Sequence, residues 1–131
     1  MKEPRKPTEA ELAILRVLWT RGPSTVREVA EAMGRAESYT TVLKLLQIMA
    51  EKGLVDRDER QRTHVYEAAY SQNETQRQLV SDLVDRLFDG SAAKLVLQAL
   101  EAGTASPDEL DEIRTLLARH RSRNAAKGGG R

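Results

Sequence analysis

Apolar residues recur at helical spacing in three segments of the first half of the chain. A stripe of apolar residues three and four positions apart covers one face of a helix, so residues 9–20, 26–33 and 39–52 are predicted to be helices. Gly22-Pro23, Gly34 and Gly53 follow these segments and mark their ends. The predicted inward-facing residues are Leu12, Leu15, Leu18 and Trp19 in the first helix, Val29, Ala30 and Met33 in the second, and Val42, Leu45, Leu46 and Met49 in the third.

After Gly53 the pattern changes to one that is typical of strands. β-branched and aromatic residues in segments 54–57 and 63–67 flank a polar tip at 58–62, which predicts an antiparallel hairpin. From Ser71 onward helical spacing returns, and it predicts helices over about 73–88, 92–101 and 107–120. Four pairs match the S/T-x-x-E capping box that marks a helix start: Thr8 with Glu11, Thr25 with Glu28, Ser71 with Glu74 and Ser106 with Glu109.

The order of these elements predicts a mainly α fold with a small β-hairpin. Three helices and a hairpin make a winged helix-turn-helix over residues 1–70, and a three-helix C-terminal dimerisation region follows over 71–121. Residues 122–131 are basic and rich in glycine at the end, so they are predicted to be a disordered tail.

Composition narrows the class of protein. The 131 residues are 40% hydrophobic and 31% charged, which is typical of a globular protein. No apolar run approaches the ~20 residues that cross a bilayer, and the first residues lack the apolar segment of a secretory signal. The absence of cysteine excludes disulfides and thiolate metal sites, so a cytoplasmic protein without membrane insertion is expected.

The outer face of the third helix carries polar groups suited to duplex DNA. Thr40, Lys44 and Gln47 lie opposite the core stripe, and Tyr39, Thr41 and Leu43 lie at its start and flanks. A helix fits the major groove, where each base pair displays its own donors and acceptors. These six residues are therefore predicted to contact DNA, Leu43 through a thymine methyl group.

The hairpin tip adds a second candidate contact with DNA. Arg57, Arg60, Arg62 and His64 lie within eight residues, and arginines on a projecting ribbon suit phosphates or a narrow minor groove. The formal net charge of the chain is only +1, so DNA binding has to depend on such local clusters. Three acidic residues share the tip and either pair with the arginines or face away: Asp56, Asp58 and Glu59.

The threonine pair and the charged hairpin tip are also compatible with a function other than DNA binding. A Thr-Thr pair at a helix start is often only a cap, and charged hairpin tips are often only solvated. The alternative is thus a winged helix that serves as a protein-interaction module without sequence-specific DNA binding.

The C-terminal helices predict a homodimer. The helix over 73–88 has a broad apolar stripe and only two short helices in its own chain to cover it. A symmetric dimer would also double the DNA contacts and require a palindromic operator. The alternative is a self-contained three-helix cap. The predicted dimerisation residues are Leu79, Val80, Leu83, Val84, Leu87, Phe88, Leu95, Leu110, Ile113 and Leu117.

No catalytic constellation is present in the sequence. It has no glycine-rich phosphate loop, no HExxH and no Gly-x-Ser-x-Gly motif. His64 and His120 are isolated, and the acidic residues after Ser106 suit the positive end of a helix better than a metal ion. An enzyme, a metal and a cofactor are all unexpected.

Five segments resemble the penicillinase-repressor family, the BlaI/MecI type: "PTEAELAILRVLW", "STVREVAEAM", "YTTVLKLLQIMAEKGLV", "THVYEAAYS" and "LFDGSAAKLVLQAL". The resemblance covers about residues 7–119. It implies a dimeric winged-helix repressor of double-stranded operator DNA, with DNA contacts from Tyr39, Thr40, Thr41, Lys44 and the wing around Arg60 to His64.

The resemblance also brings two departures into view. Members of the family often have a basic residue where this chain has Ile48. Members that a membrane sensor metalloprotease inactivates have an Asn-Phe cleavage point, whereas this chain has Leu100-Glu101-Ala102-Gly103 in that region. A copper-sensing branch uses C-terminal cysteines, which this chain lacks.

Overall fold

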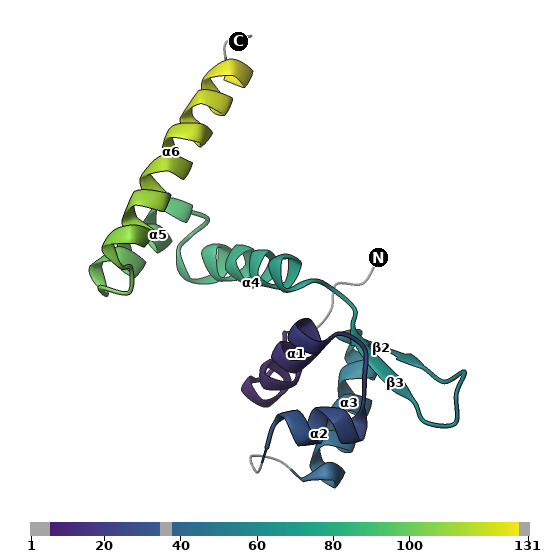
Figure 1. Ribbon diagram of the computed structural model, residues 1–131. Coiled ribbons are helices and arrows are strands. Elements are labelled where there is room, and N and C mark those ends of the chain that lie inside the picture. Colours follow the sequence, from purple (N-terminus) through teal and green to yellow (C-terminus); the bar gives the residue numbers. More distant parts are fainter. Residues whose placement is uncertain (1–5, 35–37, 129–131) are drawn as a thin grey trace. The chain divides into compact units, whose positions relative to one another are not determined.

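The computed structural model describes residues 6–34 and 38–128, with side chains through residue 124. It divides the chain into an N-terminal unit, residues 1–81, and a C-terminal unit, residues 82–131. The elements follow in the order α1 Glu9–Arg21, β1 Ser24–Thr25, α2 Val26–Ala32, α3 Tyr39–Lys52, β2 Val55–Asp58, β3 Val65–Ala68, α4 Gln72–Leu87, α5 Ala92–Glu101 and α6 Pro107–Gly128. Figure 1 labels all of them except β1.

All four predicted capping boxes are formed. At α1, the Thr8 amide donates to Glu11 Oε1 over 2.9 Å, and the Glu11 amide donates to Thr8 Oγ1 over 3.2 Å. The equivalent pairs of bonds start α2, α4 and α6. Each box satisfies amide groups that have no partner within the helix, so the sequence determines the helix starts locally.

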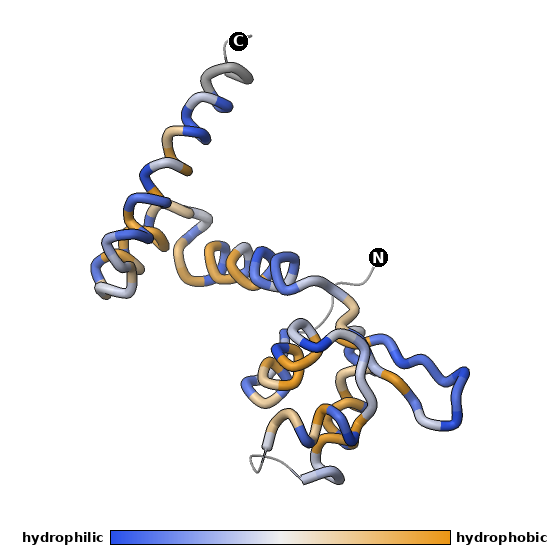
Figure 2. The backbone as a smooth tube through the Cα atoms, viewed as in Figure 1, coloured by the Kyte–Doolittle hydropathy of each residue, from blue (hydrophilic) through white to orange (hydrophobic). Residues whose placement is uncertain are grey.

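The core of the N-terminal unit lies among α1, α2, α3 and the hairpin. Figure 2 shows hydrophobic residues on the sides of the three helices and hydrophilic residues along the hairpin loop. All the predicted inward-facing residues are buried or packed against the core, and sequence reasoning missed Ile14, Val26 and Tyr66. The buried apolar residues are Ile14, Leu15, Leu18, Val26, Val29, Val42, Leu46, Met49, Leu54, Val55 and Tyr66.

The predicted hairpin is present, and a short third strand completes its sheet. The strand order is β1-β3-β2, with Ser24 opposite Tyr66 and Arg57 opposite Tyr66 on the other side. The sequence did not predict β1, because two residues are too short to show an alternating pattern. Ser24 is nevertheless buried there, and its hydroxyl donates to the Gly22 carbonyl over 2.9 Å.

Two features fix the C-terminal end of α3. Gly53 takes a left-handed conformation with φ of 80°, and the Leu54 amide donates to the Met49 carbonyl over 2.9 Å. The Lys52 Nζ atom donates to Glu11 Oε1 over 2.6 Å, with side chains only 13% and 3% exposed. This buried ion pair joins the end of α3 to the start of α1.

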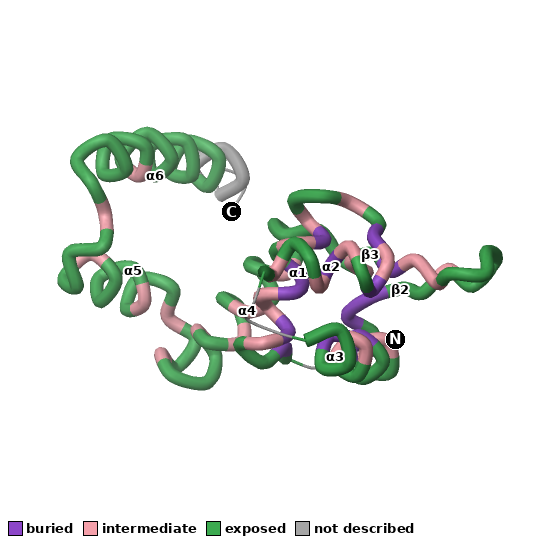
Figure 3. The backbone as a smooth tube through the Cα atoms, turned by 60° about the horizontal axis from the view of Figure 1, so that its bottom comes forward, coloured by how far each residue is buried: buried purple, intermediate pink, exposed green. Residues whose placement is uncertain are grey.

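The C-terminal unit has no buried residue among those whose burial is described, 82–124. Figure 3 shows α5 and α6 as exposed or intermediate along their described length. The sequence predicted that the last helix ends at His120 and that a disordered tail begins at Ser122. Instead α6 continues to Gly128, because no helix-breaking residue occurs before the glycines at 128–130. In the described part of the chain, no helix is long and apolar enough to span a membrane.

Candidate nucleic-acid interface

The outer face of α3 is exposed and polar, as the sequence predicted. Thr40, Lys44 and Gln47 are exposed, and none of them has a side-chain hydrogen bond or ion pair to another described residue. They recur at i, i+4 and i+7, so they share one face of the helix. The three groups are therefore available to a ligand that lies along this face.

The two threonines at the start of α3 differ in their surroundings. Ser38 caps the helix: its hydroxyl accepts a hydrogen bond from the Thr41 amide over 3.2 Å and donates to Thr41 Oγ1 over 3.0 Å. The Thr41 hydroxyl is thus part of the cap, whereas that of Thr40 has no such bond among the described residues. Sequence reasoning treated the two residues alike.

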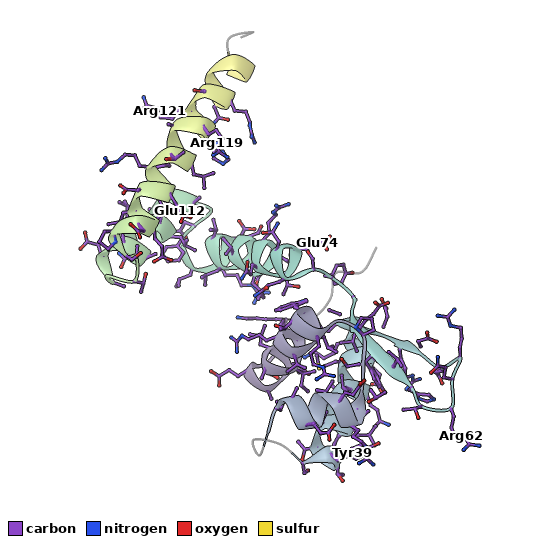
Figure 4. All side chains as sticks on the ribbon, viewed as in Figure 1. Tyr39, Arg62, Glu74, Glu112, Arg119 and Arg121 are labelled. Atoms are coloured by element: carbon purple, nitrogen blue, oxygen red, sulfur yellow. The ribbon has the colours of Figure 1, made fainter. Side chains whose placement is uncertain are left out.

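Tyr39 lies at the N-terminal end of α3, where Figure 4 labels its side chain. Its ring is about half exposed, and the guanidinium carbon of Arg27 on α2 lies 5.9 Å from the ring centroid. This is the outer limit of a cation–π contact. Sequence reasoning missed Arg27, since only the folded helix pair brings it near α3.

Two apolar residues of α3 border this polar face. Leu43 is partly buried and packs against the core, so less of it is available to DNA than the sequence indicated. Ile48 is 38% exposed.

The hairpin loop projects from the helices, and Figure 4 shows Arg62 at its far end. Arg60 is 88% exposed but is held by Asp58 through three side-chain hydrogen bonds. Its Nε donates to Oδ1 and Oδ2 over 3.0 and 3.1 Å, and its Nη2 donates to Oδ2 over 2.7 Å. The Arg60 amide also donates to Asp58 Oδ1 over 3.0 Å. These bonds stabilise the charged carboxylate and lower the pKa of Asp58 to about 2.

Glu59 faces two further side chains of the hairpin, Arg57 and His64. Its carboxylate lies 3.2 Å from Arg57 Nη2 and 3.7 Å from His64 Nε2. Arg62, by contrast, has no ion pair within the described part of the chain. The structure therefore separates the predicted wing residues: Arg60 is held by Asp58, His64 faces Glu59, and Arg62 pairs with no acidic residue of the described ranges.

Exposed apolar residues also occur on α4, and a further set occurs on α5 and α6. Between α5 and α6 lies an open groove of about 850 Å³, to which Leu95, Ile113 and Leu117 contribute. Of the predicted dimerisation residues, Leu79, Val84, Phe88, Leu95 and Ile113 are half-buried, and Val80, Leu83, Leu87, Leu110 and Leu117 are exposed. Val96, Leu97 and Leu116 are exposed too, although they are not among the predicted dimerisation residues.

The described residues contain no group of three His, Cys, Asp or Glu that could hold a metal ion.

A family model described as "Penicillinase repressor" matches residues 7–119 of the chain. The chain belongs to this family. The family consists of transcriptional repressors and not of enzymes.

Relatives with known names agree with this membership. The transcriptional regulator BlaI of Mycobacterium tuberculosis is 35% identical over 114 residues, which cover 84% of this chain and 81% of the relative. The penicillinase repressor of Bacillus licheniformis is 22% identical over 125 residues, 94% of this chain and 98% of the relative. The methicillin resistance regulatory protein MecI of Staphylococcus aureus is 20% identical over 112 residues, 84% and 91% of the two chains.

Among solved structures, a possible transcriptional regulator for arsenical resistance is similar to 63% of this chain and 91% of its own. The TM-score is 0.46 and the sequence identity 23%.

Proposed function

We propose that this DNA-binding repressor reads its operator through the outer face of α3 in the major groove. The observation that carries the proposal is that Thr40, Lys44 and Gln47 share an exposed face without partners among the described residues. Hydroxyl, ammonium and amide groups can donate hydrogen bonds to phosphates and base edges. Hydroxyl and amide groups can also accept hydrogen bonds from base edges. Tyr39, Thr41 and the exposed part of Leu43 border this face and belong to the proposed contact set.

The hairpin serves as the wing in this proposal and contacts phosphates or the minor groove. Arg62 is its principal contact, because its charge is not shared with an acidic residue of the described chain. Arg60 and His64 belong to the same surface. A protein-interaction module without DNA binding is not favoured, because the family to which the chain belongs consists of transcriptional repressors.

The exposed apolar residues of α4, α5 and α6 support a homodimer. Leu116 (49%) and Leu117 (55%) are exposed together in the groove between α5 and α6, and adjoining exposed leucines are unusual on a small monomer. Burial of such residues against a second copy would stabilise each by about 1.5–3 kcal/mol. A dimer of this kind would present two α3 helices to a palindromic operator.

Two finer points complete the proposal. A DNA-binding repressor acts where the chromosome is, so a cytoplasmic location is proposed. A membrane sensor metalloprotease would be the partner that ends repression by cleavage. The segment from Leu100 to Gly103 at the end of α5 has no Asn-Phe pair, so cleavage there would require another recognition sequence.

The test is a binding titration with the DNA upstream of this protein's own gene. Fluorescence anisotropy at physiological salt compares that duplex with a shuffled duplex of equal length and composition. The upstream duplex is expected to bind at least ~10³-fold more tightly, as specific repressors typically do. Equal affinity for the two duplexes would contradict sequence-specific repression through this operator.

A further inference from the structure

We propose that Asp58 is an internal competitor of the DNA phosphate, which occupies Arg60 in the free protein and so limits the affinity of the wing for DNA. The inference rests on the proposed role of the hairpin as a DNA-binding wing. It assigns to an acidic residue of that wing a function that opposes binding.

The geometry of the pair supports competition with phosphate. Two nitrogen atoms of the Arg60 guanidinium donate to the two carboxylate oxygens over 2.7–3.1 Å. A phosphate group accepts hydrogen bonds from arginine in the same two-pronged way. The carboxylate and a phosphate would therefore use the same donors of Arg60, and the two cannot bind fully at once.

Segment 56–64 of the hairpin has as many acidic residues as arginines, so competition for one arginine affects its attraction for DNA phosphate. Residues 56–64 contain three arginines and three acidic residues, so their formal charge is zero with His64 neutral. Glu59 faces Arg57, and Asp58 faces Arg60. Arg62 then supplies the wing's attraction for phosphate. Arg60 adds only the difference between a phosphate contact and the carboxylate contact that it gives up.

Asp58 also has a structural role that the experiment has to preserve. Its Oδ1 atom accepts a hydrogen bond from the Arg60 amide, two residues later, which is the bond of an Asx-turn at the start of a loop. Asparagine can accept the same bond through its amide oxygen but has no charge. Asp58→Asn therefore removes the competitor and leaves the turn intact.

A double-mutant cycle tests the proposal with the full-length chain and the operator duplex. Wild type, Asp58→Asn, Arg60→Ala and the double variant are compared in affinity and in the dependence of affinity on salt. In Asp58→Asn, affinity for operator and shuffled DNA is expected to rise about fivefold, because an exposed ion pair no longer has to be broken. The slope of log affinity against log salt should steepen by about 0.9, the value for one further phosphate contact.

Removal of Arg60 distinguishes two causes of a gain in affinity: release of Arg60 from Asp58, and loss of the repulsion between the Asp58 carboxylate and DNA. Arg60→Ala should change affinity less than about twofold in the wild-type background, where its charge is already balanced. In the Asp58→Asn background the same substitution should abolish the gain and the steeper slope. A gain that persists without Arg60 would mean that Asp58 only repels DNA, and the proposal would be wrong.

Asp56→Asn is the matched control. It removes the same charge from an exposed position of β2 that has no ion pair within the described residues. Its effect on affinity should be less than about twofold, since Asp56 occupies no arginine of the described residues and salt screens its exposed charge. Equal gains from Asp56→Asn and Asp58→Asn would contradict the proposal.

Folding and DNA binding are checked separately. Each variant should retain the wild-type circular dichroism spectrum, and Asp58→Ser, also a neutral acceptor, replaces Asp58→Asn if that variant unfolds. A wild-type chain that fails to prefer the operator would overturn the proposed function itself. A wild type that prefers the operator, with no gain from the neutral variants, would overturn only the role of Asp58.

Discussion

At the scale of single residues, the sequence indicated which polar groups of α3 and the hairpin are exposed, but not which of them have partners among the described residues. Helical spacing was enough to place Thr40, Lys44 and Gln47 on the outer face of α3, and all three are exposed. It did not separate Thr41, whose hydroxyl belongs to the Ser38 cap, from Thr40. It also did not assign Asp58 to Arg60, because pairing within a loop depends on the conformation of its backbone.

The first prediction concerns Arg62. Arg62→Ala should weaken binding to operator and random DNA to the same extent and reduce the salt slope by about 1, because a phosphate contact carries no sequence information. Gln61→Ala at the same tip is the neutral control and should leave the slope unchanged. Anisotropy titrations over a series of salt concentrations measure both. An unaltered slope in Arg62→Ala would remove the wing from the proposed contacts.

The second prediction concerns Lys44. Loss of a base contact typically costs about 1–3 kcal/mol, so Lys44→Ala should lose more affinity for the operator than for shuffled DNA. Arg16→Ala removes one positive charge from an exposed position of α1 and should change the two affinities equally. The ratio of the two dissociation constants is the measured quantity. If Lys44→Ala leaves that ratio as in wild type, Lys44 does not read the operator.

At the scale of elements, local sequence patterns predicted the helices and the hairpin. They did not predict the contacts between segments that lie far apart in the sequence. The capping boxes and Gly53 determined where helices begin and end, and α3 has the predicted bounds. The strand β1 and the ion pair between Glu11 and Lys52 join segments far apart in sequence. That ion pair positions the C-terminal end of α3 against α1.

The third prediction concerns this ion pair. Lys52→Met would leave the buried Glu11 carboxylate without its partner and should lower the free energy of unfolding by about 3–5 kcal/mol. Glu11→Gln retains an oxygen for the cap and should cost less. Urea unfolding followed by circular dichroism measures both. Glu28→Gln, in the more exposed capping box of α2, is the control and should have the smallest effect.

The pH dependence of stability follows from the same pair. Burial raises the pKa of Glu11, but the hydrogen bonds from Lys52 and Thr8 outweigh burial, and the pKa lies below its ordinary value of 4.5. Protons thus bind more weakly to the folded state than to the unfolded state. The contribution of Glu11 to stability is fully present above pH 4.5 and is lost as the pH falls through the folded pKa. Wild type should lose more stability than Glu11→Gln over this interval, and identical losses would contradict this reasoning.

At the scale of the whole molecule, the sequence predicted a winged helix followed by an apolar helical region. It did not predict the length of α6, because its basic last residues resemble a tail although none of them before Gly128 breaks a helix. The lack of buried residues in the described part of 82–124 supports a second copy as the cover for α5 and α6. The division at residues 1–70 and 71–121 remains a prediction.

The fourth prediction tests the dimer. Leu117→Glu should convert the dimer to a monomer and weaken operator binding, because one winged helix contacts only half of a palindromic site. Ala118→Glu adds the same charge to an exposed position of α6 that does not line the groove between α5 and α6, and it should remain dimeric. Sedimentation velocity measures the mass of each. A dimeric Leu117→Glu variant would remove this face of α6 from the interface.

The central claim is that duplex DNA contacts the outer face of α3 and the hairpin. Amide chemical-shift changes in a two-dimensional NMR spectrum, recorded as operator duplex is added, test this most directly. We predict that the largest changes occur in residues 39–48 and 57–64, and that α5 changes little. Changes concentrated in α5 and α6, with α3 and the hairpin unaffected, would contradict the account.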